Sequence, residues 1–195
     1  TFLYAIGFVG NLPVPKAIDT GPAVPMGEAL IINTLLLGVF AIQHSLMARQ
    51  GFKRLITRVI PLPAERSTYV LASSLALILL FWPWQPLGGL VWEVDHPVGR
   101  ALLYGGFGAG WALVLVATFL IDHFDLFGLK QVIRYFRGTA HREPAFLVRS
   151  LYRRVRHPLY LGFMLAFWAT PDMTFGHALF ASLATGFMLV AVRFE

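Results

Sequence analysis

The chain has 195 residues, of which 57% are hydrophobic and 13% are charged, and it carries a net charge of +6. Soluble domains contain roughly 25% charged residues, so this composition predicts an integral membrane protein. The length accommodates five or six spans of roughly 20 residues each and leaves no room for a separate soluble catalytic domain. The chain has no cysteine, which excludes disulfides, thiolate metal ligands and a cysteine nucleophile.

The basic residues gather in two segments. Residues 49–66 and 122–157 contain 13 of the 16 Lys and Arg residues, whereas residues 11–28 and 83–100 contain only Lys16 and Arg100. The positive-inside rule therefore predicts that the two basic loops face the cytoplasm. A nucleic-acid partner is not predicted, because the aromatic residues belong to apolar segments and do not alternate with the basic ones as stacking platforms would.

The first four apolar segments, taken in chain order, predict four spans. We interpret Thr1–Gly10 as part of a first span, and residues 28–48, 66–84 and 98–121 as the second, third and fourth. Pro and Gly residues mark 11–27 as a loop. Trp82, Trp84 and Trp92 are expected in an interfacial belt, and Gly106-x-x-x-Gly110 permits close helix packing in the fourth span.

The remaining residues predict a polar region followed by a helical hairpin. Residues 122–157 are expected to form an interfacial helix and loop, and Pro158–Thr170 is too short to cross a ~30 Å hydrocarbon core upright. A turn at Pro171-Asp172 precedes a final helix over 173–192. This hairpin returns Arg193 and Glu195 towards Arg156 and His157.

The predicted fold is therefore an all-α integral membrane protein with five to six transmembrane helices. Residues 1–195 form one domain, in which 1–121 hold the first four spans. Residues 122–195 hold the cytoplasmic loop and the C-terminal hairpin.

Arg156-His157-Pro158-Leu159-Tyr160-Leu161-Gly162 joins the most basic loop directly to an apolar segment. Arg156 and His157 are donors suited to a carboxylate or phosphate, and Pro158 is favourable as the first residue of a helix. Tyr160 follows His157 by three positions, so a helix stacks the two side chains. Gly162 lets another group approach closely. The alternative is an ordinary positive-inside anchor.

This run resembles the Arg-His-Pro-x-Tyr-x-Gly motif of the isoprenylcysteine carboxyl methyltransferase superfamily, whose members also carry a C-terminal Arg and Glu. Arg193-Phe194-Glu195 matches that second element, although the family pattern continues with a further acidic residue and a short tail. Three other stretches resemble one branch of the superfamily, the bacterial methanethiol S-methyltransferases. They are Gln43–Arg49, Glu65–Tyr69 and Asp122–Gly128.

The resemblance implies S-adenosylmethionine as the methyl donor, with S-adenosylhomocysteine as product, and cofactor roles for His157, Tyr160, Arg193 and Glu195. The donor's carboxylate suits His157, Tyr160 and a nearby arginine such as Arg156, whereas its ribose hydroxyls or amino group suit an acceptor such as Glu195. Without the resemblance, Arg193 and Glu195 are interpreted as a juxtamembrane ion pair.

His44 and the pair Asp122-His123 lie at the predicted cytoplasmic ends of the second and fourth spans. Ionisable residues in membrane segments are functional candidates by default, and an acid beside an imidazole can raise its basicity or orient it. A thiol must lose its proton to become a good nucleophile, so His44, His123 and Arg66 are candidates for thiol activation. The alternative is interfacial histidines bonded to loops.

No metal site is predicted, because His44, Asp122, His123 and Asp125 lack a helical spacing typical of metal ligands. His96, His141 and His177 are expected at the surface or as helix caps.

The resemblance implies conversion of methanethiol, a small volatile thiol, to dimethyl sulfide at the cytoplasmic face of a bacterial inner membrane. Alternative substrates are a prenylcysteine carboxylate or a phospholipid amine. A non-enzymatic NnrU-like membrane protein is an alternative of another class, against which the intact Arg-His-Pro-x-Tyr-x-Gly run argues. The sequence predicts no oligomeric state.

Overall fold

The computed structural model describes residues 1–139 and 155–194. Four helical segments are long and apolar enough to cross a membrane: α2 (Met26–Ala48), α4 (Glu65–Phe81, preceded by the 3-10 turn η1, Leu62–Ala64), α5 (Pro97–Ile121) and α9 (Phe175–Phe194). The shorter helices are α1 (Phe2–Val9), α3 (Gln50–Ile56), α6 (His123–Leu126), α7 (Leu129–Phe136) and α8 (Pro158–Trp168). The expected all-α membrane fold is confirmed, with four full-length helices in the described chain.

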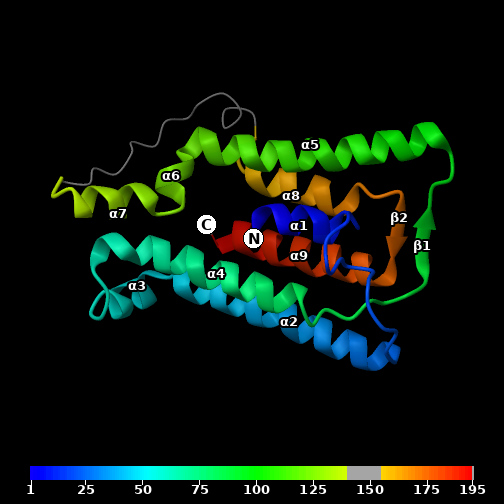
Figure 1. The fold of residues 1–195 in the computed structure, drawn as a ribbon, viewed down its shortest axis with the longest axis horizontal. Helices are drawn as coiled ribbons and strands as arrows, with labels where there is room; N and C mark the ends of the chain where they lie inside the picture. Colours follow the sequence, from blue (N-terminus) through cyan, green and yellow to red (C-terminus); the bar gives the residue numbers. More distant parts are fainter. Residues whose placement is uncertain (140–154, 195) are drawn as a thin grey trace.

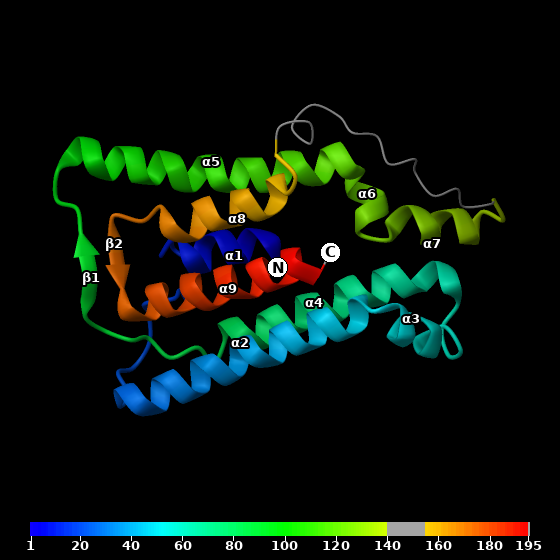
Figure 2. The ribbon, with the colours of Figure 1, turned by 180° about the vertical axis from the view of Figure 1, so that it is seen from behind.

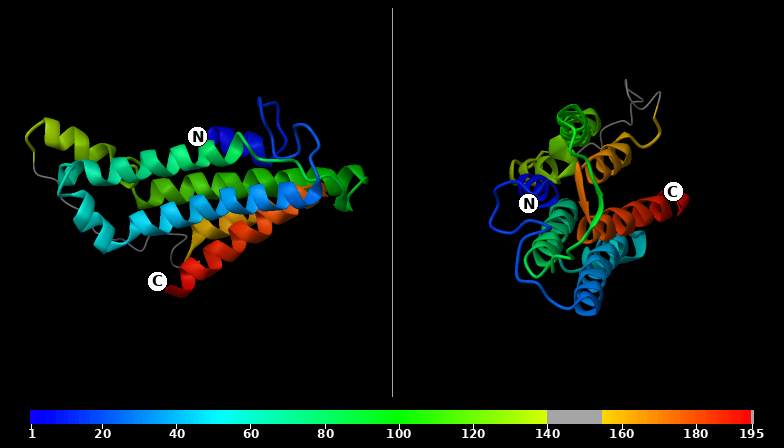
Figure 3. Two further views of the ribbon diagram at one scale, coloured as in Figure 1. Left: turned by 90° about the horizontal axis from the view of Figure 1, so that it is seen from below. Right: turned by 90° about the vertical axis from the view of Figure 1, so that its right-hand side faces the viewer.

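The helices form two layers with two helices between them. Figures 1 and 2 show α5 beside α8 in one layer and α2 beside α4 in the other, with α1 and α9 between them. The basic end, as we call it, carries α3, η1, α6 and α7. The opposite end of the bundle, which we call the strand end, carries β1 (Leu90–Glu93) and β2 (Asp172–Thr174). The C-terminal end of α9 projects to one side of the bundle (Figure 3).

The core is aromatic and centres on α1. Phe8 is fully buried and packs against Phe81 of α4, Trp84, and Phe180 of α9, with ring centroids 4.6, 6.0 and 6.1 Å away. The expectation of an interfacial Trp84 is therefore wrong, because this ring is 0% exposed. Asn33 of α2 is also buried, and its side-chain amide exchanges two hydrogen bonds with the backbone of Gln85. This pairing removes the cost of an unsatisfied polar group in the core.

The strongest helix contact joins α5 to α8 through glycines. A Cβ atom on Gly110 would lie 2.6 Å from the backbone nitrogen of Ala166, and one on Gly162 would lie 2.9 Å from the carbonyl oxygen of Gly110. The close packing expected of Gly106-x-x-x-Gly110 is confirmed. The group that approaches Gly162 is the α5 backbone, so this residue of the motif fixes the position of α8.

An antiparallel strand pair, not expected from sequence, closes the strand end. β1 pairs with β2, with Glu93 opposite Asp172, so the expected turn at Pro171-Asp172 leads into a strand and the final helix starts at Phe175. Trp92 donates its indole N–H to the Thr170 carbonyl at 3.0 Å. These contacts tie the α4–α5 connection to the α8–α9 connection.

His177, expected at the surface or as a cap, is instead buried in α9. Its side chain is 1% exposed, and Nε2 lies 2.9 Å from the carbonyl oxygen of Phe167 in α8. The surface expectation for this residue is wrong, and His177 is a core contact between α8 and α9. His96 precedes α5 at the exposed N-cap position, as expected, and His141 lies outside the described residues.

A two-pronged ion pair at the strand end leads to a pH prediction. Arg100 donates to both carboxylate oxygens of Asp172 at 2.7 Å, and this contact holds the pKa of the carboxyl below its ordinary value of 3.8. A lowered carboxyl pKa stabilises the fold above the unfolded value and ceases to do so as the pH falls through the lower folded value. Asp172→Asn is therefore expected to lower the melting temperature at pH 7. It is not expected to do so at an acidic pH below both the folded and the unfolded pKa of Asp172.

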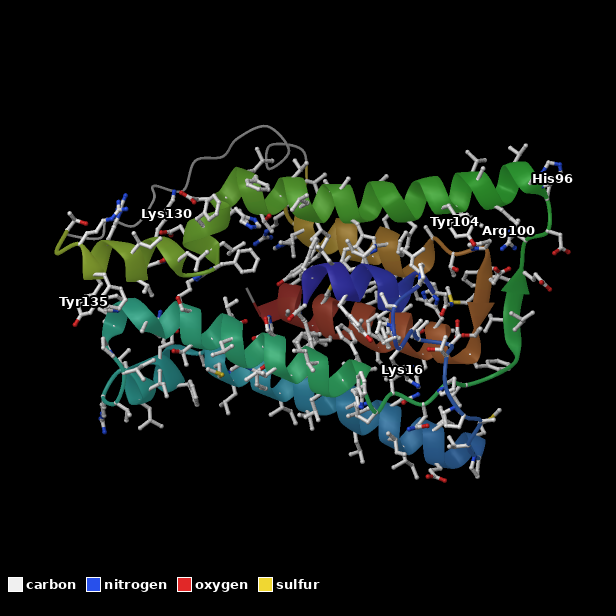
Figure 4. The ribbon with its side chains drawn as sticks, viewed as in Figure 1. Lys16, His96, Arg100, Tyr104, Lys130 and Tyr135 are labelled. Atoms are coloured by element: carbon white, nitrogen blue, oxygen red, sulfur yellow. The ribbon has the colours of Figure 1, made fainter. Side chains whose placement is uncertain are left out.

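The measurement is thermal unfolding of the detergent-solubilised protein as a function of pH. Asp95→Asn is the control, because Asp95 is an exposed carboxylate at the same end and has no ion pair within the described chain. A pH-independent deficit in Asp172→Asn would contradict the electrostatic explanation. Figure 4 shows Arg100 beside Tyr104 at this end of α5.

Candidate active site

The N-terminus of α8 and the C-terminus of α9 lie towards the basic end of the bundle. The two helices run in opposite directions (Figures 1 and 2), and the Trp168 indole donates to the Thr185 hydroxyl at 3.0 Å where they pack together. The expected C-terminal hairpin is confirmed. Arg193 is exposed in the last turn of α9, and Glu195 lies outside the described residues.

The Arg-His-Pro-x-Tyr-x-Gly run begins α8 as expected. His157 is the N-cap residue and Pro158 is the first helical residue. The rings of His157 and Tyr160 are stacked, with centroids 5.5 Å apart and an interplanar angle of 14°. Arg156 is exposed whereas His157 and Tyr160 are partly buried, so the run passes from the surface into the helix layer within one turn.

His44 near the end of α2 is held by hydroxyl groups of α4. The Tyr69 hydroxyl lies 3.0 Å from Nδ1 and 2.9 Å from Nε2 of the imidazole, and the Ser73 hydroxyl lies 3.3 Å from Nδ1. Phe40 stacks on the ring at 5.3 Å, and Phe187 of α9 meets it edge-on at 6.3 Å. The imidazole is thus enclosed by three helices at the basic end.

Tyr69 links this cluster to the α8 motif. It lies within electrostatic range of Tyr160 on α8 and of Arg66, one turn earlier on α4. The side chains of His44, Tyr69, Tyr160 and His157 therefore form a polar series from α2 through α4 to α8, with a hydrogen-bond contact between His44 and Tyr69, an electrostatic interaction between Tyr69 and Tyr160, and a ring stack of Tyr160 on His157. We call it the polar series below.

Asp122 and His123 do not form the expected acid–imidazole pair. Asp122 caps α6 by accepting a hydrogen bond from the backbone N–H of Asp125, and it forms an ion pair with Lys130. The hydrogen bond from Lys130 holds the pKa of the Asp122 carboxyl below its ordinary value. His123 Nδ1 instead lies 2.9 Å from the hydroxyl of Thr118, so Asp122 acts on α6 and not on the imidazole.

His123 is also packed among aromatic rings. Phe119 stacks on it with centroids 4.4 Å apart and an angle of 11°, and Phe127 lies at 4.7 Å. Within the described chain, no hydrogen bond, ion pair or ring contact joins His123 or Asp122 to His44. The two candidate base positions thus belong to separate clusters, and the polar series includes only His44.

Arg66, a third candidate for thiol activation, also has a structural contact. Its Nε donates to the carbonyl of Leu126 at 2.8 Å, and the neighbouring Ser67 hydroxyl donates to the carbonyl of Gly128 at 2.9 Å. Gly128 has φ +78 and its α-carbon faces Ser67, so a side chain there would clash with α4. The N-terminus of α4 thereby positions the α6–α7 turn.

Two residues of the cluster, Tyr69 and Ser73, were not among the candidate site residues predicted from sequence, although Tyr69 ends the stretch Glu65–Tyr69 that resembles the methanethiol S-methyltransferases. The sequence feature that could have identified them is their spacing, because hydroxyl-bearing residues four positions apart in an apolar segment share one helix face. In sequence they resemble ordinary polar residues near a helix end. Within residues 1–139 and 155–194, no group of three or more His, Cys, Asp or Glu side chains is placed to hold a metal ion.

An apolar helical bundle that gathers imidazole, hydroxyl and guanidinium groups at one end has the arrangement of a membrane-embedded enzyme. The chain is 56% identical over 194 residues to the methanethiol S-methyltransferase of Mycobacterium tuberculosis, covering 100% of this chain and 80% of the relative. It is 51% identical over 195 residues to that of Crocosphaera subtropica, covering 76% of the relative. The chain therefore belongs to the methanethiol S-methyltransferase family, and the expected family membership is confirmed.

A more distant similarity extends to animal proteins named Nurim. The chain is 34% identical over 170 residues to a Nurim homolog of Drosophila pseudoobscura pseudoobscura, covering 83% of this chain and 66% of the relative. No family model matches the chain. No solved structure matches it either.

Proposed function

We propose that the protein transfers a methyl group from S-adenosylmethionine to methanethiol, forming dimethyl sulfide at the cytoplasmic face of a bacterial inner membrane. The observation that carries this proposal is the full-chain identity of 56% to a relative named for this activity. The polar series at the basic end supports it, because positive loops mark the cytoplasmic side.

The residues at the start of α8 fit the anionic end of the methyl donor. Arg156 and Arg193 are exposed cations, and the His157–Tyr160 stack provides an imidazole and a hydroxyl on one helix face. Such donors form charge-assisted hydrogen bonds to a carboxylate. When bound, S-adenosylmethionine supplies a methyl group on a positively charged sulfur. Glu195, the candidate acceptor for the ribose or amino group, remains a prediction.

The residues of α2 and α4 serve the thiol. A thiol is mostly protonated at neutral pH, and His44 is the imidazole that the polar series connects to the α8 motif. The rings of Phe40 and Phe187 exclude water from one side of His44. Attack of a thiolate on a cationic methyl donor neutralises charge, so a poorly hydrated site favours the reaction once the reactants are positioned.

The test is to incubate the purified protein with isotope-labelled S-adenosylmethionine and methanethiol and to measure labelled dimethyl sulfide in the headspace. We expect dimethyl sulfide with methanethiol, and no transfer to a prenylcysteine carboxylate or to phosphatidylethanolamine. Transfer only to the prenylcysteine or to the lipid would show that this compound, and not methanethiol, is the substrate. Absence of transfer to all three, with no binding of S-adenosylhomocysteine, would favour a non-enzymatic NnrU-like role.

Cofactor affinity is expected to depend on His157 and Tyr160. Loss of one charge-assisted hydrogen bond costs ~1.5 to 3 kcal/mol, so His157→Ala and Tyr160→Phe are each expected to weaken S-adenosylhomocysteine binding roughly ten- to a hundredfold. Isothermal titration calorimetry measures this. His96→Ala and Tyr135→Phe are matched controls, since Figure 4 places His96 at the strand end and Tyr135 on α7. Unchanged affinity in both test variants would show that His157 and Tyr160 do not bind the cofactor.

A further inference from the structure

We propose that the hydroxyl of Tyr69 relays the proton of the thiol to His44. This inference rests on the proposed function and deepens it, because it assigns a role to Tyr69, a residue of the polar series that lies outside the Arg-His-Pro-x-Tyr-x-Gly run. Three observations on the described residues support it: the enclosure of His44, the place of Tyr69 within the polar series, and the charge near its hydroxyl.

The first observation is that both nitrogens of His44 are covered by hydroxyl groups. The Tyr69 hydroxyl is within hydrogen-bond distance of Nδ1 and of Nε2, at 3.0 and 2.9 Å, and the Ser73 hydroxyl is 3.3 Å from Nδ1. The rings of Phe40 and Phe187 cover further parts of the imidazole. A neutral imidazole has one N–H and one unprotonated nitrogen, and the Tyr69 hydroxyl is placed to donate its proton to the unprotonated one.

The second observation selects Tyr69 over Ser73. Tyr69 makes the shorter contact with the imidazole and also interacts electrostatically with Tyr160, which belongs to the candidate cofactor motif. Ser73 contacts His44 and Gln43 on α2 and also hydrogen-bonds Tyr69, but no contact relates Ser73 to α8 among the described residues. Tyr69 thus lies between the candidate base and the helix that carries the cofactor residues, as a relay requires.

The third observation is the charge around the phenol. The titratable and charged groups that act on Tyr69 are His44 from α2, Glu65 and Arg66 from α4, and Tyr160 from α8. α9 contributes the ring of Phe187 beside His44. Arg66, the cation of this set, favours negative charge on the phenolic oxygen, whereas Glu65 and Tyr160 oppose it. The phenol therefore acts as a neutral O–H that gives up one proton as it takes another, and not as a free phenolate.

The relay moves two protons in one direction and leaves one electron pair on the thiol sulfur. The S–H bond of methanethiol breaks and its proton goes to the oxygen of Tyr69, while the O–H proton of Tyr69 goes to the unprotonated nitrogen of His44. The electron pair left on the thiol sulfur forms the new S–C bond with the methyl group, and the bond between that carbon and the donor sulfur breaks with its electrons remaining on the donor. Tyr69 ends neutral, and the imidazolium of His44 later releases the proton to water.

The experiment compares Tyr69→Phe with the wild type from pH 6 to 9. The variant keeps the ring and removes the relay, so kcat for methanethiol is expected to fall roughly 10²-fold near pH 7, in line with the usual contribution of general base catalysis. The rate of Tyr69→Phe is expected to rise about tenfold for each unit of increasing pH, because more of the methanethiol in solution is then already thiolate. Affinity for S-adenosylhomocysteine and the melting temperature are expected to match the wild type.

Tyr104→Phe is the matched control, because it removes the same hydroxyl from α5 at the strand end (Figure 4). Ser73→Ala removes the other hydroxyl that contacts His44, and a smaller loss of turnover than in Tyr69→Phe is expected because the contact between Tyr69 and His44 remains. A wild-type rate in Tyr69→Phe would overturn the relay, as would a loss that does not change with pH. Failure of the wild type to form dimethyl sulfide would instead contradict the proposed function, so the two failures are distinguishable.

Discussion

Replacing His44 with alanine is expected to reduce methanethiol turnover by roughly 10²- to 10⁴-fold, the range that a positioned general base contributes. His44 is the imidazole of the polar series and the end point for the thiol proton in the proposed reaction. A group that acts in the chemical step lowers kcat without changing the affinity for the methyl donor. Headspace measurement of dimethyl sulfide and calorimetry with S-adenosylhomocysteine separate these effects.

His123→Ala and Asp122→Asn are the comparison variants for this prediction. Both residues lie at the basic end, but His123 contacts Thr118 and Phe119, and Asp122 caps α6 and pairs with Lys130. We therefore expect these variants to alter stability more than proton removal. If His123→Ala instead reproduced the pH-dependent loss expected of His44→Ala, the base would lie in the α5–α6 cluster.

The sequence predicted the spans well because hydropathy is a property of each segment alone. The expected spans at 28–48 and 98–121 agree with α2 and α5 to within two residues, and the short helix after Pro158 was expected from its length. Hydropathy does not distinguish a ring in the lipid interface from one in the core. Trp84 and His177 were misplaced for this reason, since the burial of each depends on packing against another helix, α1 for Trp84 and α8 for His177.

The candidate site was predicted in part for a related reason. The stack of His157 on Tyr160 follows from helical spacing within one segment, so the sequence is sufficient to predict it. The partner of His44 lies 25 residues away on another helix, and adjacency in sequence favoured the wrong partner for His123. The β1–β2 pair was missed because strands of four and three residues give almost no alternating pattern.

Adding a single methyl group at Gly110 is expected to separate α5 from α8 and to weaken cofactor binding at a distance. A Cβ atom there would lie 2.6 Å from the Ala166 nitrogen and 2.8 Å from the Gly162 oxygen. Both atoms are backbone, so no side chain can rotate away and the helices must move apart. Overpacking a well-packed contact costs typically ~1–3 kcal/mol, and more where the backbone must shift. We expect about 3 kcal/mol or more for Gly110→Ala.

Gly105→Ala is the matched control on the same helix, because a Cβ atom at Gly105 meets nothing within 4 Å. Glycine costs ~1 kcal/mol relative to alanine inside a helix, so this control is expected to be neutral or stabilising while Gly110→Ala lowers the melting temperature and the folded yield. Since Gly162 follows Tyr160 by two residues, a displaced α8 also shifts the His157–Tyr160 stack relative to α4. Weaker S-adenosylhomocysteine binding in Gly110→Ala, with normal binding in Gly105→Ala, is the expected result. Equal behaviour of the two variants would show that the α5–α8 contact does not position the candidate site.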